Sequence, residues 1–394
     1  MSEEIACMKT VVIVGAGHVA PDAISNLRRA GWEGKIVLIG DEPYLPYQRP
    51  PLSKGYFSDD IKKEKLLIRN EAFYEKSNVE LRLGQRVESI DRVASTVLLD
   101  NGDSVAYDKL ILATGTRARG LPVSGIDQSN AFYLRTQDDV EQIKSKVGPN
   151  TKLLIVGAGY IGLELAASAV KKQIQVTVLE AMDRVLARVT GTEVSNFYQD
   201  IHTQADVDIR LNASLKGFDN IDDKHVAFMA NGDVIEFDVV VIGIGVIPNS
   251  EIAEKADLQC DNGIIVNEFT QTSDPNIYAV GDVSNHPSLI YNKRVRLESV
   301  PNAAGQAKVA ASHICGNEIA YNQLPWFWSD QYDVKLQTAG LFQGYDETKV
   351  TGDIEQRCFS VSYFKEGKLI AIDSLNSPAD FMKAKKQIVE DLSA

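Results

Sequence analysis

The feature that most constrains the fold of this chain is an internal repeat. The segment at residues 10–18 (TVVIVGAGH) returns at residues 152–160 as KLLIVGAGY. Each copy begins with a run of β-branched and leucine residues, which is typical of a parallel strand buried on both faces. Each run ends in glycines and leads into a helical stretch, the arrangement that places a phosphate at a helix N-terminus. The repeat therefore predicts two nucleotide-binding units in one chain.

Each copy also has a matching later segment. Residues 107–116 and 237–246 share an aromatic–aspartate pair, a buried strand and a turn of small residues. A further strand at 276–283 has no counterpart in the second copy, so we expect the first domain to resume after the second. From about residue 324, short alternating segments predict an antiparallel sheet, closed by a helix from about Pro378.

Composition narrows the class of protein. The 394 residues include 41 basic and 54 acidic side chains, a net charge of −13, with 44% apolar content. This balance is ordinary for a globular protein and argues against nucleic acid as the main ligand. The longest apolar stretches are broken by glycines, and the first of them contains Glu164, so we expect no membrane span. Residues 1–7 are acidic and have neither a secretory nor a transit pattern, which favours a cytoplasmic location.

Cysteines and histidines give no sign of a metal site. Cys7, Cys260, Cys315 and Cys358 lie far apart, without C-x-x-C or zinc-like spacing, and the five histidines do not cluster. We therefore expect a reduced chain with no bound metal.

The second glycine loop satisfies G-x-G-x-x-G with Gly157, Gly159 and Gly162. These glycines permit a tight turn, an approach of the backbone to a pyrophosphate, and close packing of helix on strand. Glu180 ends the next strand, 23 residues after Gly157, where an acidic residue binds an adenosine ribose. A carboxylate there favours NADH over NADPH, although Arg184 and Arg188 nearby weaken that preference. A purely structural glycine turn is the alternative.

The first glycine loop is less regular. It has Gly15 and Gly17 but Ala20 at the third position, and Pro21 follows directly. Alanine is tolerated there. Proline is acceptable only in the first helical turn, where its missing N–H has no partner to lose. Asp41, just after the strand at 35–39, is the candidate acid for a second ribose.

Two dinucleotide sites suggest a relay in which one cofactor stays bound and the other delivers hydride. A flavin suits the resident role because it accepts hydride and returns electrons singly. The proline-rich segment 42–54 either wraps a ligand or turns a corner, and composition alone favours the corner.

With these motifs the chain resembles the ferredoxin and rubredoxin reductases of the FAD-dependent pyridine nucleotide-disulfide oxidoreductase superfamily. Those enzymes supply bacterial cytochrome P450 and Rieske-type oxygenases. The resemblance covers nearly the whole chain. The proline-rich motif at residues 43–54 and the motifs at 298–303 and 326–331 are specific to this group, whereas the glycine motifs alone are not. The motifs are residues 15–18, 43–54, 112–115, 157–164, 179–181, 278–282, 298–303 and 326–331.

The resemblance implies an α/β fold with two Rossmann-like domains and a C-terminal α+β domain. It implies hydride transfer from NADH to bound FAD, then single electrons passed to a [2Fe-2S] ferredoxin or a rubredoxin. The domains would be residues 1–115 with 249–323 for FAD, 116–248 for NAD, and 324–394 at the partner interface.

The resemblance also implies site residues. Lys54 would lie near flavin N5 and pair with Glu164, Tyr160 would shield the flavin until nicotinamide arrives, and Trp328 would lie toward the partner. A plain ion pair, and a core position for Trp328, are the alternatives. The implied cofactor-binding set is Gly15, Ala16, Gly17, His18, Val19, Asp41, Arg49, Lys54, Val87, Ala113, Thr114, Gly115, Arg135, Gly157, Gly159, Ile161, Gly162, Glu180, Arg188, Gly245, Gly281, Asp282, Glu298 and Val300.

Other readings of the same motifs remain open. Disulfide reductases of this superfamily pass electrons through cysteine facing the flavin, and none lies between Asp41 and Lys54. That absence disfavours an NADH oxidase, peroxidase or disulfide reductase and favours an external acceptor. A redox-sensing protein similar to apoptosis-inducing factor is a further alternative. For an acidic ferredoxin, Lys293, Arg294 and Arg296 are the expected docking cations.

Overall fold

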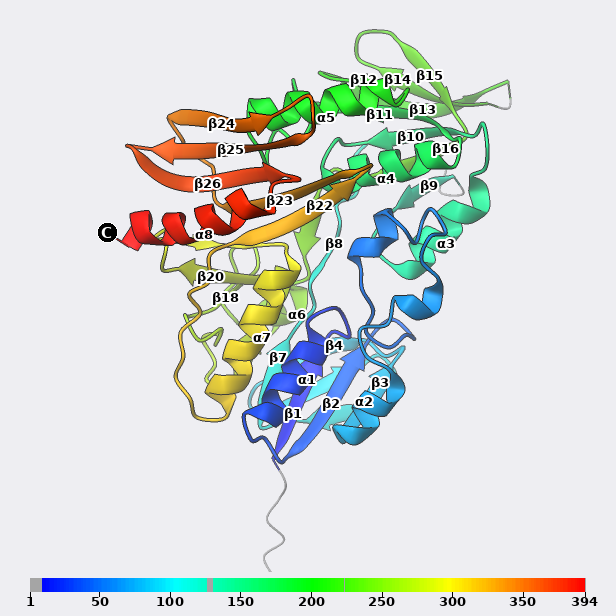
Figure 1. Cartoon of the computed structure of the whole chain (residues 1–394). Coiled ribbons are helices and arrows are strands. Elements are labelled where there is room, and N and C mark those ends of the chain that lie inside the picture. Colours follow the sequence, from blue (N-terminus) through cyan, green and yellow to red (C-terminus); the bar gives the residue numbers. More distant parts are fainter. Residues whose placement is uncertain (1–8, 126–129, 223, 394) are drawn as a thin grey trace, which may run out of the picture. The chain divides into compact units, whose positions relative to one another are not determined.

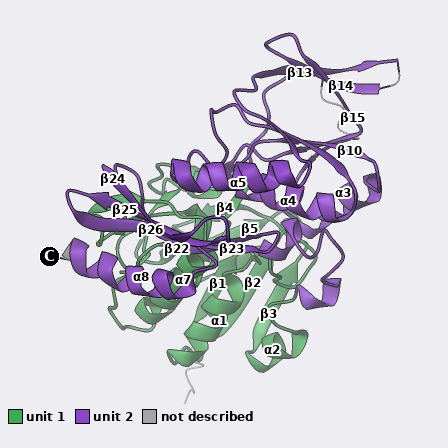
Figure 2. Cartoon of the chain, turned by 45° about the horizontal axis from the view of Figure 1, so that its top comes forward, with its two compact units in different colours: residues 1–48, 67–117, 248–325 green, residues 49–66, 118–247, 326–394 purple. Residues whose placement is uncertain are grey.

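The protein is described by a computed structural model, which covers residues 9–125, 130–222 and 224–393. The chain forms two compact units, coloured separately in Figure 2. Unit 1 consists of residues 1–48, 67–117 and 248–325. Unit 2 consists of residues 49–66, 118–247 and 326–394. Unit 2 contains both the second repeat and the C-terminal segment, and the three-domain division stays a prediction.

Unit 1 is built on a five-stranded parallel sheet with the order β19-β7-β1-β2-β3. Figure 1 labels β7, β1, β2 and β3 of this sheet. Successive side chains of a strand point to opposite faces. Val11 and Ile13 therefore belong to one buried cluster, with α1 and α7, while Val12 and Val14 belong to another. Burial on both faces explains the unbroken apolar runs. The elements are β1 (Thr10–Val14), β2 (Lys35–Gly40), β3 (Val79–Leu83), β7 (Lys109–Leu112), β19 (Ile277–Ala279), α1 (Ala20–Arg29) and α7 (Val300–Ile314).

The second face of this sheet is covered by a small antiparallel sheet and a short helix. Val97 and Val105 of that sheet share a buried cluster with Ala253 of the helix. These elements are β4 (Val87–Asp91), β5 (Thr96–Leu99), β6 (Ser104–Ala106) and α6 (Glu251–Lys255). The remaining elements of unit 1 are α2 (Glu71–Lys76), β18 (Ile264–Ile265), η3 (Gly281–Val283), β20 (Ser284–Ser288) and β21 (Lys293–Val295).

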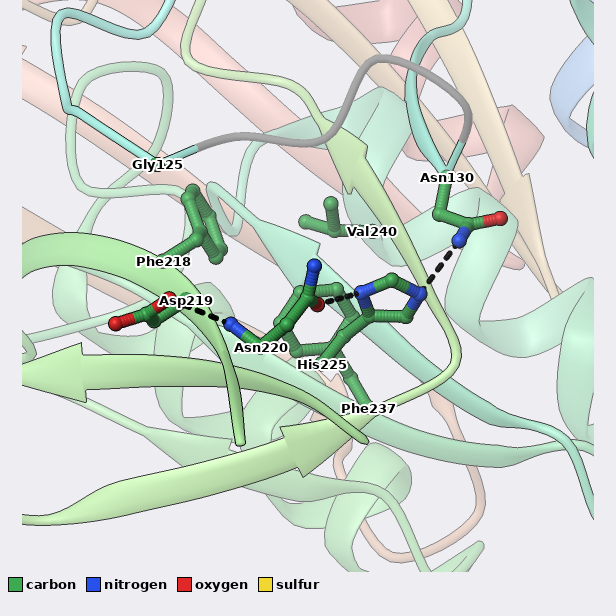
Figure 3. A pocket seen from close by; sticks show the side chains of 8 residues that line it. All are labelled: Gly125, Asn130, Phe218, Asp219, Asn220, His225, Phe237 and Val240. Atoms are coloured by element: carbon green, nitrogen blue, oxygen red, sulfur yellow. Dashed lines mark hydrogen bonds between the residues drawn. The ribbon is translucent and has the colours of Figure 1, made fainter. Parts of the chain in front are cut away.

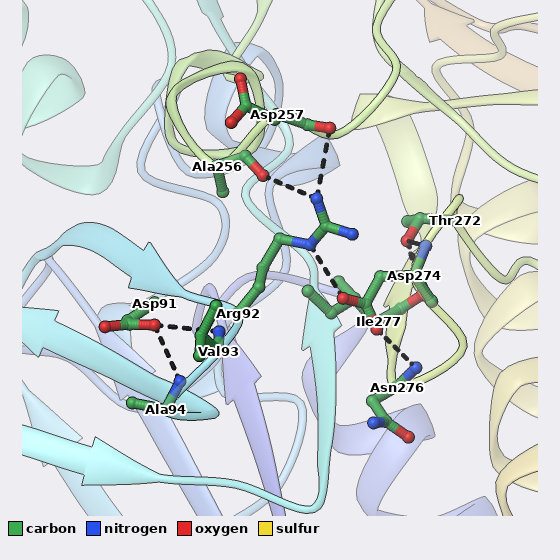
Figure 4. A network of polar contacts seen from close by, with 10 residues as sticks. All are labelled: Asp91, Arg92, Val93, Ala94, Ala256, Asp257, Thr272, Asp274, Asn276 and Ile277. Carbon is green, nitrogen blue, oxygen red and sulfur yellow. Dashed lines mark hydrogen bonds and ion pairs between the residues drawn. The ribbon is translucent and has the colours of Figure 1, made fainter.

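Arg92 connects the antiparallel sheet and α6 with the turn before β19 (Figure 4). Its guanidinium donates to Asp274 Oδ2 at 2.8 Å and to the carbonyls of Ala256 and Asp257 at 3.2 and 3.4 Å. Asp274 Oδ1 in turn accepts from the Asn276 N–H at 2.9 Å. The ion pair therefore fixes the turn from which β19 enters the sheet.

Unit 2 repeats the parallel sheet, with the order β12-β11-β10-β16-β9. β9 pairs with β16 as β19 pairs with β7 in unit 1. The expectation that the third strand has no counterpart in the second copy is therefore wrong. The counterpart precedes its sheet in sequence, and its three residues carry no strand signal of their own. The elements are β9 (Ala131–Tyr133), β10 (Lys152–Val156), β11 (Gln175–Leu179), β12 (Asp208–Arg210), β16 (Val239–Ile242), α3 (Gln137–Lys146), α4 (Tyr160–Lys171) and α5 (Thr192–Gln204).

Two antiparallel sheets complete unit 2. One is β13 (Leu215–Ile221), β14 (Lys224–Met229) and β15 (Val234–Phe237). The C-terminal sheet, order β22-β23-β26-β25-β24, is followed by α8 (Pro378–Ser393), as the sequence predicts. Its strands are β22 (Trp326–Gln331), β23 (Val334–Gly340), β24 (Glu347–Asp353), β25 (Cys358–Lys365) and β26 (Lys368–Leu375). The short elements η1 (Pro50–Ser53) and η2 (Lys63–Lys65) also belong here, and the chain passes between units within β8 (Thr116–Ala118) and β17 (Val246–Pro248). Within the described ranges, no helix is both long and apolar enough to cross a membrane.

We expect Arg92→Met to lower the free energy of unfolding by about 1–3 kcal/mol, because it leaves the half-buried Asp274 carboxylate without its charged donor. Urea unfolding measures this loss. The matched control is Lys386→Met, which removes an ion pair whose side chains are 81% and 62% exposed. That control should change stability by less than about 0.5 kcal/mol. Equal losses in both variants would contradict the anchoring role of Arg92.

Candidate functional site

The first glycine loop follows β1 and leads into α1. Gly15 has φ +113°, and an ideal Cβ there would lie 2.2 Å from the Ala113 carbonyl oxygen. Only glycine fits this turn. At Gly17 a Cβ would meet no described atom within 4 Å, so the loop is open at its second glycine. Pro21 lies in the first turn of α1, as expected.

Other candidate residues of unit 1 lie where parallel strands end. Asp41 follows β2, the segment 113–115 follows β7, and Gly281 with Asp282 follows β19. Because the carboxyl ends of parallel strands share one edge of the sheet, these positions lie on the same side as the glycine loop. The structure therefore brings together Gly15, Ala16, Gly17, His18, Val19, Asp41, Ala113, Thr114, Gly115, Gly281 and Asp282.

Hydrogen bonds hold this edge in place. Gly281 N–H donates to Gln306 Oε1 of α7 at 2.7 Å, and Thr114 Oγ1 donates to the Asn249 carbonyl at 2.8 Å. Asp41 is exposed, with Arg86 at 3.5 Å. Three further candidates are not strand-end residues: Val87 is buried in the core, Val300 begins α7, and Glu298 is exposed.

The second glycine loop follows β10 and repeats this construction. Gly157 has φ +110°, and its Cβ would lie 2.4 Å from the Gly243 carbonyl oxygen. A Cβ at Gly162 would lie 2.2 Å from the Gly157 carbonyl oxygen, so α4 packs closely on the turn. At Gly159, as at Gly17, a Cβ would meet nothing described within 4 Å. The tight turn at Gly157 and the close packing at Gly162 are those that the spacing predicts, whereas the approach of a pyrophosphate at Gly159 stays a prediction.

Glu180 lies beside this second loop. Its carboxylate accepts from the Ala158 N–H at 2.8 Å and from the Met182 N–H at 2.9 Å. The acid is therefore held at the end of β11, next to the glycine turn. The Arg188 guanidinium lies 3.8 Å from the ideal Cβ position of Gly245, and Ile161 is 40% exposed in the first turn of α4.

A buried ion pair joins Lys54 to α4. Lys54 Nζ lies 2.7 Å from Oε2 of Glu164, whose residue is only 5% exposed. Ser53 Oγ donates to the same oxygen at 2.6 Å, and Ser329 Oγ of β22 donates to Oε1 at 2.6 Å. These donors compensate the desolvation that a buried carboxylate suffers.

The two serines were not predicted as site residues. They contact Glu164 across 111 and 165 residues of sequence, and no local pattern signals such a contact. The same is true of His202, whose Nε2 lies 2.8 Å from Gln331 Oε1, while Gln331 Nε2 donates to Ser329 Oγ at 3.3 Å. Burial lowers the pKa of His202 to about 4, so its ring is neutral.

The remaining candidates of unit 2 lie on or beside η1, α4 and β22. Arg49 donates to the Arg135 carbonyl at 2.8 Å, beside η1. The Tyr160 ring, at the start of α4, packs edge-on against Phe327 with a centroid distance of 4.6 Å. Its hydroxyl is buried and has no hydrogen-bond partner in the part of the chain that the structure describes. Trp328 is partly exposed on β22, so it is not a fully buried core residue.

The three expected docking cations lie on or directly after β21, and their docking role stays a prediction. Arg294 donates to the carbonyls of Val266 and Asn285, and Arg296 pairs with Glu298 at 2.7 Å. The Arg296 side chain is 10% exposed. Both guanidiniums make internal contacts, but Arg294 is exposed like Lys293, so two of the three cations reach the surface.

The described cysteines are all free thiols. Cys260 packs against the core of unit 1, Cys315 caps α7, and Cys358 begins β25, while Cys7 lies outside the described residues. Burial raises the pKa of Cys260 to about 11 and raises that of Cys315 as well. A thiol with a raised pKa is a poor nucleophile at neutral pH.

A small pocket in unit 2 contains none of the predicted residues (Figure 3). The His225 ring stacks on Phe237, and its Nδ1 and Nε2 each lie 2.5 Å from a side-chain amide, of Asn220 and Asn130 respectively. With both ring nitrogens occupied, His225 is a packing residue. The lining residues are Gly125, Asn130, Phe218, Asp219, Asn220, His225, Phe237 and Val240.

We expect opposite effects on stability from substitution of the crowded Gly157 and of the open Gly159. Gly157→Ala should destabilise the protein strongly, because its Cβ would overlap a carbonyl oxygen at a positive φ. Gly159→Ala should leave the thermal midpoint within about 2 °C of wild type, because its Cβ faces open space. If this loop binds NAD⁺, as the sequence predicts, the variant should nevertheless weaken NAD⁺ binding at least about tenfold, because the methyl group would occupy the predicted approach of the pyrophosphate. Calorimetry measures both quantities, and unchanged NAD⁺ affinity in the Gly159 variant would contradict this assignment.

The chain is similar to known proteins over nearly its whole length. Residues 9–307 match the pyridine nucleotide-disulphide oxidoreductase family, and residues 326–394 match the reductase C-terminal family. The chain is 43% identical to putidaredoxin reductase CamA of Pseudomonas putida, over 97% of this chain and 92% of that protein. It is 42% identical to rhodocoxin reductase of Rhodococcus erythropolis, over 97% and 90%.

A crystal structure of the covalent putidaredoxin reductase–putidaredoxin complex matches with a TM-score of 0.94 and 42% identity, covering 97% of this chain and 93% of that one. The α/β fold class, the resemblance and the expectation of an oxidoreductase are confirmed by these matches. The chain belongs to the pyridine nucleotide-disulphide oxidoreductase family.

Proposed function

We propose that this protein is an NADH-dependent ferredoxin reductase. It takes a hydride from NADH and delivers single electrons to a [2Fe-2S] ferredoxin, or to a rubredoxin, that serves a cytochrome P450 or another oxygenase. One NADH would reduce two acceptor molecules and release one proton. The observation that carries the proposal is the near full-length similarity to putidaredoxin reductase, including the C-terminal family at residues 326–394. A cytoplasmic location is part of the proposal, since NADH is a cytoplasmic reductant.

FAD and NADH are the cofactors of this enzyme, and the residues of both glycine loops fit them. An open second glycine in front of a helix N-terminus leaves room for a diphosphate at each loop. Bound FAD supplies the link between the two electron steps, because it accepts hydride and releases electrons singly. Residues of unit 1 at the strand ends would hold it, with Asp41 accepting hydrogen bonds from its ribose.

The second loop would hold NADH. Glu180 would accept hydrogen bonds from the adenosine ribose, and its charge would repel the 2′-phosphate of NADPH. Arg188 and Gly245 would lie along the same edge of the sheet. Tyr160 would cover the flavin until nicotinamide replaces it, with Ile161 and Gly162 behind it in α4.

Lys54 and Glu164 would set the charge near the flavin. The Lys54 ammonium would stabilise negative charge on the reduced ring, and Glu164 would hold the ammonium in place. Arg49, Arg135, Val87, Glu298 and Val300 are proposed as further cofactor contacts. Trp328, partly exposed on β22, would lie on the partner side.

The decisive assay is NADH-dependent reduction of cytochrome c with and without an added [2Fe-2S] ferredoxin. The proposal predicts reduction that requires ferredoxin and falls with rising salt. Activity that needs no ferredoxin, or that appears only with peroxide or a disulfide, would instead identify an oxidase, a peroxidase or a disulfide reductase.

We expect Glu180→Gln to reduce the preference for NADH over NADPH by about tenfold, because it removes the charge but keeps an acceptor for one of the two backbone N–H groups. The ratio of kcat/KM for the two nucleotides measures this. Glu236→Gln, at an exposed ion pair on β15, is the control and should leave the ratio unchanged. An unaltered ratio in the Glu180 variant would show that this residue does not determine the preference for NADH over NADPH.

A further inference from the structure

The loop after β11, residues 183–191, lies against the second glycine loop. The Leu186 N–H donates to the Ala158 carbonyl at 3.0 Å. The loop is closed from within by the Arg184 guanidinium, which donates to the carbonyls of Ala187 and Thr190, each at 2.9 Å. We call this segment the 183–191 loop. Its position therefore bears directly on the turn proposed to bind NADH.

The far end of this loop is bound to the C-terminal sheet. Thr190 Oγ1 donates to Oδ2 of Asp373 on β26, and Tyr363 OH of β25 donates to the same oxygen at 2.7 Å. The Gly191 N–H donates to Tyr363 OH at 3.0 Å. An ideal Cβ on Gly191 would lie 2.6 Å from the Tyr363 ring, so the loop end and the ring fit closely.

Asp373 has no cation among these contacts. Its residue is 4% exposed, and among the described residues its carboxylate accepts side-chain hydrogen bonds from hydroxyl groups alone. The titratable groups that interact with it are Tyr363, Tyr160 of α4 and Tyr198 of α5. Glu164 also interacts with Tyr160 and Tyr198, and Asp330 interacts with Tyr198. A buried charge without a counter-ion is costly, and an apolar residue would usually be more stable there. Stability alone does not account for this carboxylate.

We propose that Asp373 is a positioning residue for NADH. Through Thr190 and Tyr363 it holds the 183–191 loop against the second glycine loop, and its ionised form holds the loop more firmly than its neutral form. The inference rests on NADH binding at that loop, as proposed above.

Burial raises the pKa of Asp373 to about 6, with hydrogen bonds from Thr190 and Tyr363 acting in the opposite direction. The carboxyl group is therefore charged above about pH 6 and neutral below it. Hydrogen bonds to a charged acceptor are stronger than those to a neutral one. NADH affinity should accordingly fall as the pH drops through 6. Folding stability has the opposite sign, because an acid with a raised pKa loses its stabilising contribution as the pH rises.

The test compares wild type with Asp373→Asn as holoenzymes, using NAD⁺ titration calorimetry and thermal unfolding at about pH 5 and about pH 7.5. Wild-type NAD⁺ affinity should be about fivefold weaker at the lower pH. The variant should bind weakly at both values. Its thermal midpoint relative to wild type should rise between pH 5 and 7.5, although its affinity is lower. A merely structural role would lower midpoint and affinity together.

Two further variants keep the outcome decisive. Tyr363→Phe retains the ring and removes the hydroxyl, so it should weaken NAD⁺ binding even if the Asp373 variant fails to fold. Ser374→Ala, which removes a buried hydroxyl bonded to Ser360 in the same sheet, should leave affinity unchanged. Wild-type affinity in both Asp373→Asn and Tyr363→Phe would overturn the inference. Absence of NAD⁺ binding by wild type would instead contradict the proposed function.

Discussion

Close packing of main chain on main chain shapes both glycine loops. Gly15 lies against the Ala113 carbonyl and Gly157 against the Gly243 carbonyl, and neither position has space for a Cβ. Each turn is also fixed by a bond to the neighbouring strand, from Gly15 N–H to Ile39 and from Gly157 N–H to Leu179. The proposals for FAD and NADH depend on these turns, because only an exposed backbone can approach a diphosphate closely.

Two buried carboxylates of unit 2 each connect segments that are distant in sequence, but they are stabilised by different donors. Glu164 has a lysine and two serine hydroxyls, whereas Asp373 has hydroxyl donors only. Both link segments that are distant in sequence: the proline-rich segment and β22 meet at Glu164, and the 183–191 loop meets the C-terminal sheet at Asp373. Hydrogen bonds to a buried carboxylate in this unit therefore connect the loop next to the proposed NADH site with the sheet that carries Trp328.

Features with local signals could be predicted from the sequence. The apolar runs before Gly15 and Gly157 identified two parallel strands, and Pro21 lies in a first helical turn as its chemistry requires. Features set by distant contacts could not. β9 is too short to carry a pattern, and Ser329 is one polar residue of a strand until Glu164 meets it. Asp373 stands out in the sequence as an aspartate within the apolar run of β26, but the sequence does not show which residues contact it.

We infer that electrons pass from NADH to an iron–sulfur protein without a thiol intermediate. The most direct measurement is an anaerobic titration of NADH into enzyme with excess oxidised [2Fe-2S] ferredoxin, before and after alkylation of accessible cysteines. We expect two ferredoxins to be reduced for each NADH, with no change on alkylation. Loss of ferredoxin reduction on alkylation, or oxidation of NADH with no ferredoxin reduced, would contradict this inference.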